Sequence, residues 1–491
     1  MKHLHPIMLA GTGSDVGKSI ITTGLCRIFL EDGYSPAPFK AQNMALNSYA
    51  TPDGKEIGRA QAVQAEAAGI PCCTDMNPLL LKPSSDKTSQ VVLNGKPIGN
   101  RNAYEYFRVE GREELRREVH KAFDRLAACY NPIVMEGAGS IAEINLRATD
   151  LVNMSMARYA NADVILVADI DRGGVFASVY GSIMLQDESD RKRIKGIIVN
   201  KFRGDMRLFD SGRKLMEQIC NVPVLGVVPY LNDIHIEEED SVSLDKKHRE
   251  ASCDNKINIA VVLLRHISNF TDFDAIEKDP RVHLFYTNNV AEIAHADIII
   301  IPGSKSTIAD LYELKTNGVA DAVIRAHRRG CSVVGICGGF QMMGLEVHDP
   351  DGVEGDMRSI AGLGLLPVVT DLTGQKVTRQ VEFCYDGSLC QGYEIHMGQT
   401  SLHGGEPFVR LADGTSDGCR VSVGCWGSYI HGVLDNPAVI SSLLSPHVSC
   451  GDSQRTFDYS EYKQSQYNAL ARELRTYIDI DALYKIMGRD D

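Results

Sequence analysis

A cysteine at position 337 lies in sequence surroundings that suit a nucleophile. Residues 333–341 (VVGICGGFQ) predict an apolar strand, a sharp turn with glycines around Cys337, and the start of a helix. Such a turn exposes the side chain at its apex, and small neighbours relieve the crowding. The following helix favours a thiolate, and the N–H of Gly338 could stabilise an oxyanion, with a second donor from the tight loop at Gly303. Most single cysteines are buried apolar residues, but the surroundings of Cys337 favour a nucleophile. The pattern predicts that its sulfur attacks a carbonyl group.

A nucleophilic cysteine needs a nearby base, and two histidines compete for that role. His431 follows an apolar strand expected at 427–430 and precedes a glycine. His396 lies in the run 392–398 (GYEIHMG). We expect His431 to be the base and keep His396 as its alternative.

A glycine-rich loop near the N-terminus predicts a phosphate site. A strand expected at 7–10 runs into residues 11–19 (GTGSDVGKS) and then into a helix-like run. Glycines let successive N–H groups turn toward phosphate oxygens, and the helix adds its positive N-terminal end. Lys18 would reach the β- and γ-phosphates, and the Ser19 hydroxyl would bind Mg²⁺. The loop residues expected to hold the nucleotide are Gly11, Thr12, Gly13, Val16, Gly17, Lys18 and Ser19.

The spelling of this loop narrows the class of nucleotide-binding protein. The first glycine of the usual pattern would fall on Thr12, and the observed order resembles the dethiobiotin-synthetase-like branch of P-loop proteins. Partition ATPases carry a signature lysine where this chain has Gly13. The loop therefore argues against a nucleotide switch of the partition type.

Three polar residues that end apolar runs belong with this loop. They are Lys40, Glu136 and Asn200. In a doubly wound sheet, the carboxyl ends of the strands face the ligand. We expect Glu136 to be an Mg²⁺ ligand beside Ser19, and Lys40 to neutralise a transferring phosphoryl group or hold a substrate carboxylate. The Asn200 amide could read the edge of a purine ring.

Length, charge and cysteine usage exclude several classes of protein. A chain of 491 residues predicts two or three domains. A formal net charge of −13 argues against a general nucleic-acid binder. No apolar run approaches the roughly 20 residues that span a bilayer, and no signal peptide is visible, so we expect a cytoplasmic protein without a membrane partner. The 13 cysteines form no C-x-x-C pairs, which indicates reduced thiols.

The elements that must position these residues follow a βαβ pattern, because short apolar runs alternate with helical ones. The sequence predicts an α/β fold with two doubly wound domains. The first spans 1–232, a polar linker 233–256, the second domain 257–445 and a helical C-terminal extension 446–491. A helix is expected at 112–129, and strands at 7–10, 133–136, 164–168, 194–200, 223–228, 257–264, 298–301, 332–336 and 427–430.

Cys337, His431 and the loop at Gly303 together resemble the type 1 glutamine amidotransferase domain, which releases ammonia from glutamine through a cysteinyl thioester. The resemblance implies a flavodoxin-like sheet for the second domain. Most members of that superfamily carry a glutamate two residues after the histidine, where this chain has Val433. The branch that holds the cobyric acid and cobyrinic acid a,c-diamide synthases shares this departure, which resembles a Cys–His dyad. What orients the imidazole is left open.

The order of the two domains is specific to that branch, and within it the chain resembles the cobyric acid synthase family. The matching runs are FKAQNM at 39–44, DGKEIGRAQ at 53–61, NPLLLKP at 77–83, DIDRGG at 169–174, PGSKST at 302–307 and GYEIHMG at 392–398. The resemblance implies ATP- and Mg²⁺-dependent amidation of the b, d, e and g carboxylates of adenosylcobyrinic acid a,c-diamide. It implies glutamine, ATP and a corrinoid as small-molecule partners. The sequence leaves open whether the chain forms a homo-oligomer. Contacts to the corrinoid are expected from Gln42, Asn43, Asn47, Ser48, Arg59 and Lys82, beside Lys40.

Three alternatives stand beside this interpretation. The chain could amidate the a and c positions of cobyrinic acid, although the runs near Gln42 and Gln61 argue against that. It could be a nucleotide switch whose second domain is a vestigial glutaminase, which an intact Cys337–His431 pair disfavours. A lone cysteine hydrolase or peptidase would leave the phosphate loop without a task.

Overall fold

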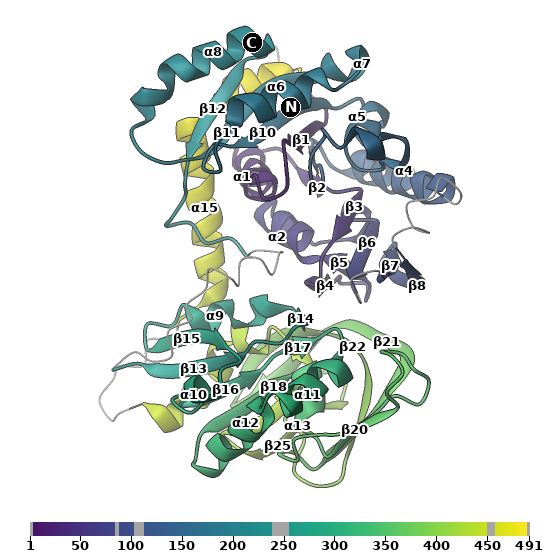
Figure 1. Cartoon of the computed structure of the whole chain (residues 1–491), viewed down its shortest axis with the longest axis vertical. Helices are drawn as coiled ribbons and strands as arrows, with labels where there is room; N and C mark the ends of the chain where they lie inside the picture. Colours follow the sequence, from purple (N-terminus) through teal and green to yellow (C-terminus); the bar gives the residue numbers. More distant parts are fainter. Residues whose placement is uncertain (1–2, 84–87, 103–111, 238–254, 449–456, 489–491) are drawn as a thin grey trace. The chain divides into compact units, whose positions relative to one another are not determined.

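The computed structural model describes residues 3–83, 88–102, 112–237, 255–448 and 457–488 (Figure 1). The chain forms two compact units. The first comprises Met1–Ala45, Ile57–Glu237 and Tyr462–Asp491, and the second comprises Leu46–Glu56 and Glu238–Glu461. The expected linker falls mostly on residues 238–254, which lie outside the described residues. Two segments therefore belong to a different unit from the residues next to them in sequence: residues 46–56 are part of the second unit, and the C-terminal residues from Tyr462 are part of the first.

A six-stranded sheet with parallel neighbours forms the centre of the first unit. Its order is β12-β11-β10-β1-β9-β2, so β9 and β2 lie on one side of β1 and β10, β11 and β12 lie on the other, all parallel to their neighbours. The strands are nearly continuous apolar runs because helices cover both faces of such a sheet. Their bounds are β1 Ile7–Gly11, β2 Ala37–Phe39, β9 Ile133–Glu136, β10 Asp163–Asp169, β11 Ile194–Phe202 and β12 Val224–Pro229.

The helices of the first unit include two from the far end of the chain. The helix α15 (Tyr459–Tyr477) buries Leu470 and Leu474 in the same apolar cluster as α1 (Lys18–Glu31). A Cβ on Gly24 of α1 would lie 2.3 Å from Leu474, so a glycine is needed for this close approach. The other helices are α2 Arg59–Ala67, α4 Arg112–Cys129, α5 Met154–Tyr159, α6 Val175–Met184, α7 Glu188–Arg191, α8 Asp210–Cys220 and α16 Ile480–Ile486.

A smaller sheet of order β3-β6-β7-β8 completes the first unit. Its strands are β3 Gln42–Met44, β6 Leu79–Pro83, β7 Thr88–Leu93 and β8 Lys96–Asn102. A two-stranded sheet of β4 (Ser48–Ala50) and β5 (Glu56–Gly58) lies along the chain between β3 and α2. The sequence patterns did not predict these short strands, because no long apolar run marks them.

The second unit is built on another six-stranded sheet, of order β15-β13-β16-β18-β26-β25. Neighbouring strands are parallel except at the edge, where β25 runs antiparallel to β26. The strands are β13 Ile257–Val262, β15 Val282–Thr287, β16 Ile298–Ile301, β18 Ser332–Ile336, β25 Cys419–Ser422 and β26 Cys425–Ser428. The helices are α9 Asp274–Glu277, α10 Val290–Ile293, α11 Thr307–Thr316, α12 Val319–Arg328, α13 Gly338–Met343 and α14 Pro437–Leu444.

A five-stranded mixed sheet, β20-β19-β21-β22-β27, extends this unit with a long hairpin. The hairpin strands are β21 Val368–Tyr385 and β22 Ser388–Leu402, and the others are β19 Glu346–His348, β20 Ser359–Ala361 and β27 Ile430–His431. Two short pairs are β14 Ile267–Ser268 with β17 Gly303–Ser304, and β23 Val409–Arg410 with β24 Ser416–Asp417.

The predicted fold class is confirmed, since both main sheets consist chiefly of parallel strands joined by helices. One predicted strand was wrong. Residues 427–430 are divided between β26 and β27, which lie in different sheets. The chain changes sheet at Tyr429, whose N–H donates to Asp417 Oδ1 at 3.2 Å instead of to a strand neighbour. No helix in the described residues has the length and apolar character to cross a bilayer.

Candidate active site

Cys337 occupies a strained turn between β18 and α13. Its backbone has φ 52° and ψ −108°, a conformation that residues with a side chain rarely adopt. The turn requires glycines: a Cβ on Gly339 would lie 1.9 Å from the carbonyl oxygen of Ile301, and one on Gly335 would lie 2.7 Å from Gly339. Strain of this kind persists where the surrounding packing enforces it, and it sets the thiol at the carboxyl end of β18.

His431 on β27 lies beside Cys337 and forms a hydrogen bond with a carboxylate, while the Cys337 thiol donates to the carbonyl oxygen of Ile395 at 3.6 Å. Its Nδ1 donates to Asp272 Oδ2 at 2.7 Å, and Asp272 Oδ1 accepts the N–H of Gly432 at 3.0 Å. The His431 and Asp272 side chains are 1% and 3% exposed. The two bonds fix both oxygens of the carboxylate, so Asp272 holds the imidazole with its other nitrogen toward the thiol. Cys337, His431 and Asp272 are thus of the residue types, and in the order, that a nucleophile, a base and an orienting acid require.

Asp272 supplies the acid that the sequence left open, and it corrects the expectation of a dyad. It lies 159 residues before His431, in the short 3₁₀ turn Phe270–Phe273. Nothing in the run NFTDFD around it distinguishes this aspartate from a helix-capping one. Only the fold brings it to the histidine.

The electrostatics of the array favour a charged imidazole. Burial alone would lower the pKa of His431, but the negative charges of Asp272 and Cys337 and their hydrogen bonds outweigh it and raise the pKa to about 10. At neutral pH the histidine therefore carries two protons beside the sulfur. A protonated imidazole beside a sulfur can donate a proton to a leaving group.

The alternative histidine, His396, has different surroundings. Burial lowers its pKa to about 4. Its Nδ1 lies 2.9 Å from the carbonyl oxygen of Gly398, and its ring stacks on Tyr429 with centroids 3.8 Å apart. No carboxylate contacts it among the hydrogen bonds of the described residues. The geometry favours His431 as the base.

Two glycine loops meet beside this pair. A Cβ on Gly303 would lie 3.5 Å from Cε1 of His431, and one on Gly338 would lie 2.8 Å from the backbone nitrogen of Ser304. The loop of Gly303 is held by the pairing of β17 with β14. Gly303 therefore lies beside His431, and Gly338 follows Cys337 directly; their role as oxyanion donors stays a prediction.

In the first unit, the glycine-rich loop has the conformation of a phosphate cradle. Gly17 has φ 96°, and Lys18 Nζ folds back to the carbonyl oxygens of Gly13 and Gly139 at 3.0 and 3.1 Å. A Cβ on Gly11 would lie 2.8 Å from this nitrogen. Thr12 and Val16 lie in the same loop, and the N–H of Thr12 donates to the carbonyl oxygen of Val167 at 3.0 Å, which joins the loop to β10. A left-handed glycine and a lysine folded over the loop are features that phosphate binding requires.

Glu136, at the carboxyl end of β9, is held by three polar side chains. Its Oε1 accepts from Ser19 Oγ and Lys40 Nζ, both at 2.9 Å, and its Oε2 accepts from Gln64 Nε2 at 2.6 Å. Burial would raise the pKa of Glu136, but the charge and hydrogen bond of Lys40, with help from Gln64 and Lys18, lower it. The carboxylate is thus ionised. An ionised carboxylate next to a serine hydroxyl is a donor set that suits Mg²⁺ bound to phosphate oxygens.

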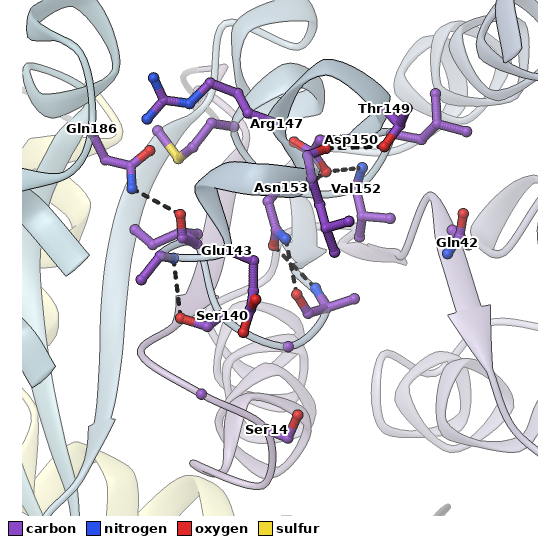
Figure 2. A pocket seen from close by; sticks show the side chains of 18 of the residues that line it. Ser14, Gln42, Ser140, Glu143, Arg147, Thr149, Asp150, Val152, Asn153 and Gln186 are labelled. Atoms are coloured by element: carbon purple, nitrogen blue, oxygen red, sulfur yellow. Dashed lines mark hydrogen bonds between the residues drawn. The ribbon is translucent and has the colours of Figure 1, made fainter. Parts of the chain in front are cut away.

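A cavity of about 540 Å³ lies beside the phosphate loop (Figure 2). Gln42 lines it together with residues 12–14 and the loop that follows β9. Asn153 fixes that loop by bonding the N–H and the carbonyl oxygen of Ala138 at 3.1 and 2.9 Å, and Gln186 donates to the carbonyl oxygen of Ile141 at 2.8 Å. Arg112 reaches the wall and donates to the carbonyl oxygen of Thr149. The cavity therefore has a preformed polar wall that includes residues 12–14 of the glycine-rich loop.

The other predicted site residues of the first unit lie in structural contacts. Arg59 forms a buried ion pair with Glu237 at 2.6 Å. Asn43 Nδ2 donates to Gln61 Oε1 at 3.0 Å, and Lys82 is buried on β6. Asn200 donates from Nδ2 to the carbonyl oxygen of Val16 at 2.9 Å, so its amide supports the phosphate loop.

Asn47 and Ser48, which were expected to contact the corrinoid, belong to the second unit. Gln42 and Lys40 belong to the first unit. The roles of these residues toward a substrate stay predictions.

Comparison with known proteins identifies both units. Residues 7–244 match the family model of the CobQ/CobB/MinD/ParA nucleotide binding domain, and residues 258–439 match that of the CobB/CobQ-like glutamine amidotransferase domain. The chain is 68% identical to the cobyric acid synthase of Phocaeicola vulgatus and 66% identical to that of Bacteroides fragilis, each over 100% of both chains. The cobyric acid synthase of Parabacteroides distasonis is 55% identical over 98% of this chain and 99% of its own.

These matches confirm the resemblance in both domains and in their order. Identity at this level over the full chain exceeds what a shared fold alone would give. The chain belongs to the cobyric acid synthase family of glutamine amidotransferase ligases.

Proposed function

We propose that this chain amidates the b, d, e and g carboxylates of adenosylcobyrinic acid a,c-diamide, with glutamine as the nitrogen source and ATP as the activating nucleotide. The observation that carries the proposal is the presence of two chemically complementary sites in one chain. One places a thiol beside an imidazole that is hydrogen-bonded to a carboxylate. The other combines a phosphate loop with Lys18, Lys40 and Glu136.

The thiol site is suited to releasing ammonia from glutamine. The Cys337 thiolate attacks the side-chain amide carbon, and the N–H groups at Gly303 and Gly338 stabilise the negative oxygen. The C–N bond then breaks while His431 gives its proton to the departing nitrogen, leaving a thioester. His431 next takes a proton from water as the water attacks the thioester, which releases glutamate. Asp272 keeps the imidazole in the orientation that both proton transfers need.

The phosphate site is suited to making a carboxylate reactive. An oxygen of the substrate carboxylate attacks the γ-phosphorus of ATP. The bond between the γ-phosphorus and the oxygen that bridges it to the β-phosphate breaks, and an acyl phosphate and ADP form. Ammonia then attacks the carbonyl carbon, and phosphate leaves with the former carboxylate oxygen. Lys18 and Lys40 offset the charge that collects on the transferring group. We assign the carboxylate being activated to the cavity in Figure 2, because that cavity adjoins residues 12–14 of the loop.

Mg²⁺ fits this site through Ser19 and Glu136. A bound Mg²⁺ would supply charge neutralisation for the phosphate oxygens. The Ser19–Glu136 hydrogen bond of 2.9 Å places the two oxygens on the same side of the loop, where each could become a ligand. Lys40 would then be the remaining cationic partner of the Glu136 carboxylate.

Mass spectrometry of the corrinoid product tests the proposal directly. The full chain is incubated with ATP, Mg²⁺, glutamine and adenosylcobyrinic acid a,c-diamide, and in parallel with cobyrinic acid. Conversion of four carboxylates to amides in the first reaction is expected. Conversion of only two carboxylates, and only of cobyrinic acid, would instead identify an a,c-diamide synthase. A third reaction with GTP in place of ATP tests the nucleotide.

A further inference from the structure

Residues 46–56 come from the phosphate-loop half of the sequence, yet they are part of the second unit. We call them the inserted segment. It contains β4, a tight turn, and the first residue of β5. The turn is closed by the N–H of Thr51, which donates to the carbonyl oxygen of Lys55 at 2.7 Å, and by the Thr51 hydroxyl, which bonds Asp53 at 2.5 Å. The segment is therefore an ordered hairpin.

The inserted segment is anchored on the β21 strand of the long hairpin. Gln380 Nε2 donates to the carbonyl oxygen of Ala50 at 3.0 Å. Lys376 and Glu56 form a buried ion pair with side chains 7% and 0% exposed. A buried charge stays in place only where its partner is fixed, so this pair ties the end of the segment to β21.

One route from the segment to His431 runs through two aromatic rings. The Tyr49 ring lies against the ring of Tyr393, with centroids 4.5 Å apart. Tyr393 pairs directly with His431 across β22 and β27, and its ring stacks on the imidazole at 5.2 Å with an interplanar angle of 26°. Facing side chains on neighbouring strands restrict each other's orientation. Tyr49 thus backs the ring that covers one face of His431.

A second route reaches Asp272 through the backbone. The N–H of Ser48 donates to Asn269 Oδ1 at 3.0 Å, and this bond is buried. Asn269 has φ 52°, a left-handed conformation that asparagine tolerates better than most residues, and it opens the 3₁₀ turn of Asp272. The N–H of Asp272 donates in turn to the carbonyl oxygen of Asn269 at 3.0 Å. The segment therefore holds the residue from which the Asp272 turn starts.

We propose that the inserted segment positions the thiol site: Tyr49 acts on His431 through Tyr393, and Ser48 acts on Asp272 through Asn269. This inference rests on the proposed glutaminase function of the site. Neither Tyr49 nor Ser48 touches the sulfur, so both are positioning residues. The phosphate-loop half of the sequence thus contributes to ammonia release as well as to nucleotide binding.

Variants of the full chain test this proposal. Tyr49→Ala removes the ring, Tyr49→Phe keeps it, and Asn269→Gly keeps the left-handed backbone while it deletes the acceptor for Ser48. Tyr312→Ala, a change at an exposed tyrosine of α11, is the control. Each variant is assayed for glutamate release from glutamine, for amidation with ammonium chloride in place of glutamine, and for the pH dependence of Cys337 alkylation by iodoacetamide.

Loss of orientation predicts a specific pattern. Tyr49→Ala and Asn269→Gly should lower kcat for glutamate release by about tenfold to a hundredfold, with the KM for glutamine and ammonium-dependent amidation unchanged. The alkaline limb of the alkylation profile should move to lower pH, because a displaced Asp272 holds the imidazole proton less tightly. Tyr49→Phe and Tyr312→Ala should behave as the wild type.

Wild-type kcat and an unshifted alkylation profile in both Tyr49→Ala and Asn269→Gly would overturn the proposal. So would an equal loss of the glutamine- and ammonium-dependent reactions, which points to general damage. If Tyr49→Ala does not fold, Asn269→Gly decides alone. A wild-type chain that releases no glutamate at all refutes the proposed function itself, so the two failures are distinguishable.

Discussion

Replacing Asp272 with asparagine should strongly lower kcat for ammonia release while the fold stays intact. Both carboxylate oxygens accept hydrogen bonds, one from His431 Nδ1 at 2.7 Å and one from the N–H of Gly432 at 3.0 Å. An asparagine has one oxygen and can accept only one of these bonds. If its oxygen accepts from His431 Nδ1, its NH₂ group faces the N–H of Gly432, which is also a donor. If its oxygen accepts from Gly432, its NH₂ group faces His431 Nδ1, so the imidazole proton must lie on Nε2. In the latter case the nitrogen facing Cys337 carries the proton even in the neutral ring, so it cannot act as a base.

The size of the effect follows from the charge at this site. The rise in the pKa of His431 from 6.5 to about 10 corresponds to roughly 5 kcal/mol in favour of the protonated ring. Burial opposes this rise, and among the groups that cause it the charge of Asp272 is the largest. Since general acid–base catalysis contributes about 10²- to 10⁴-fold, we expect kcat for glutamate release to fall by that factor in Asp272→Asn.

The assay is the rate of glutamate formation from glutamine by the full chain. Ammonium-dependent amidation serves as the internal control, because that reaction does not use the thiol. Asp274→Asn is the matched variant, since Asp274 lies two residues further along and begins α9 without bonding His431. A kcat within threefold of wild type in Asp272→Asn would refute the role assigned to this carboxylate.

Four further predictions concern the two sites. Cys337→Ala should abolish glutamine-dependent amidation and retain the ammonium-dependent reaction, as product analysis will show; loss of both would contradict the division of labour. Lys18→Met should stop amidation from either nitrogen source while glutamate release persists, and undiminished amidation would count against the phosphate site. Gly339→Ala should lower the free energy of unfolding by about 1–3 kcal/mol or more in urea titrations, because its Cβ would lie 1.9 Å from the carbonyl oxygen of Ile301, and an unchanged midpoint would disprove the clash. The pKa of His431 is raised to about 10, so the stability that its protonation contributes is complete below about pH 6.5 and is lost as the pH rises toward 10. The difference in free energy of unfolding between wild type and His431→Gln should therefore shrink across that pH range. A constant difference would argue against a charged imidazole.

The local features of both sites were predictable because they depend on neighbours in sequence. The strand-to-helix turn at Cys337 needs an apolar run, small residues and a helix start, and all three are contiguous in residues 333–341. The loop at Lys18 is equally local, and the strand of Glu136 has its predicted bounds. Parallel strands that are buried on both faces are nearly continuous apolar runs, so the fold class could also be predicted.

Only the tertiary structure decided which distant residues complete the sites. Asp272 reaches His431 across 159 residues, and no spacing rule connects a 3₁₀ turn with a strand so far along the chain. The inserted segment belongs to the second unit and most of the helix α15 to the first, and neither assignment follows from position in the sequence. A periodic pattern reports that a side chain will be buried, but the partner that buries it is chosen by the packing of whole elements. The sequence by itself thus determined the chemistry that this protein can perform, and the fold determined how the reacting groups are oriented.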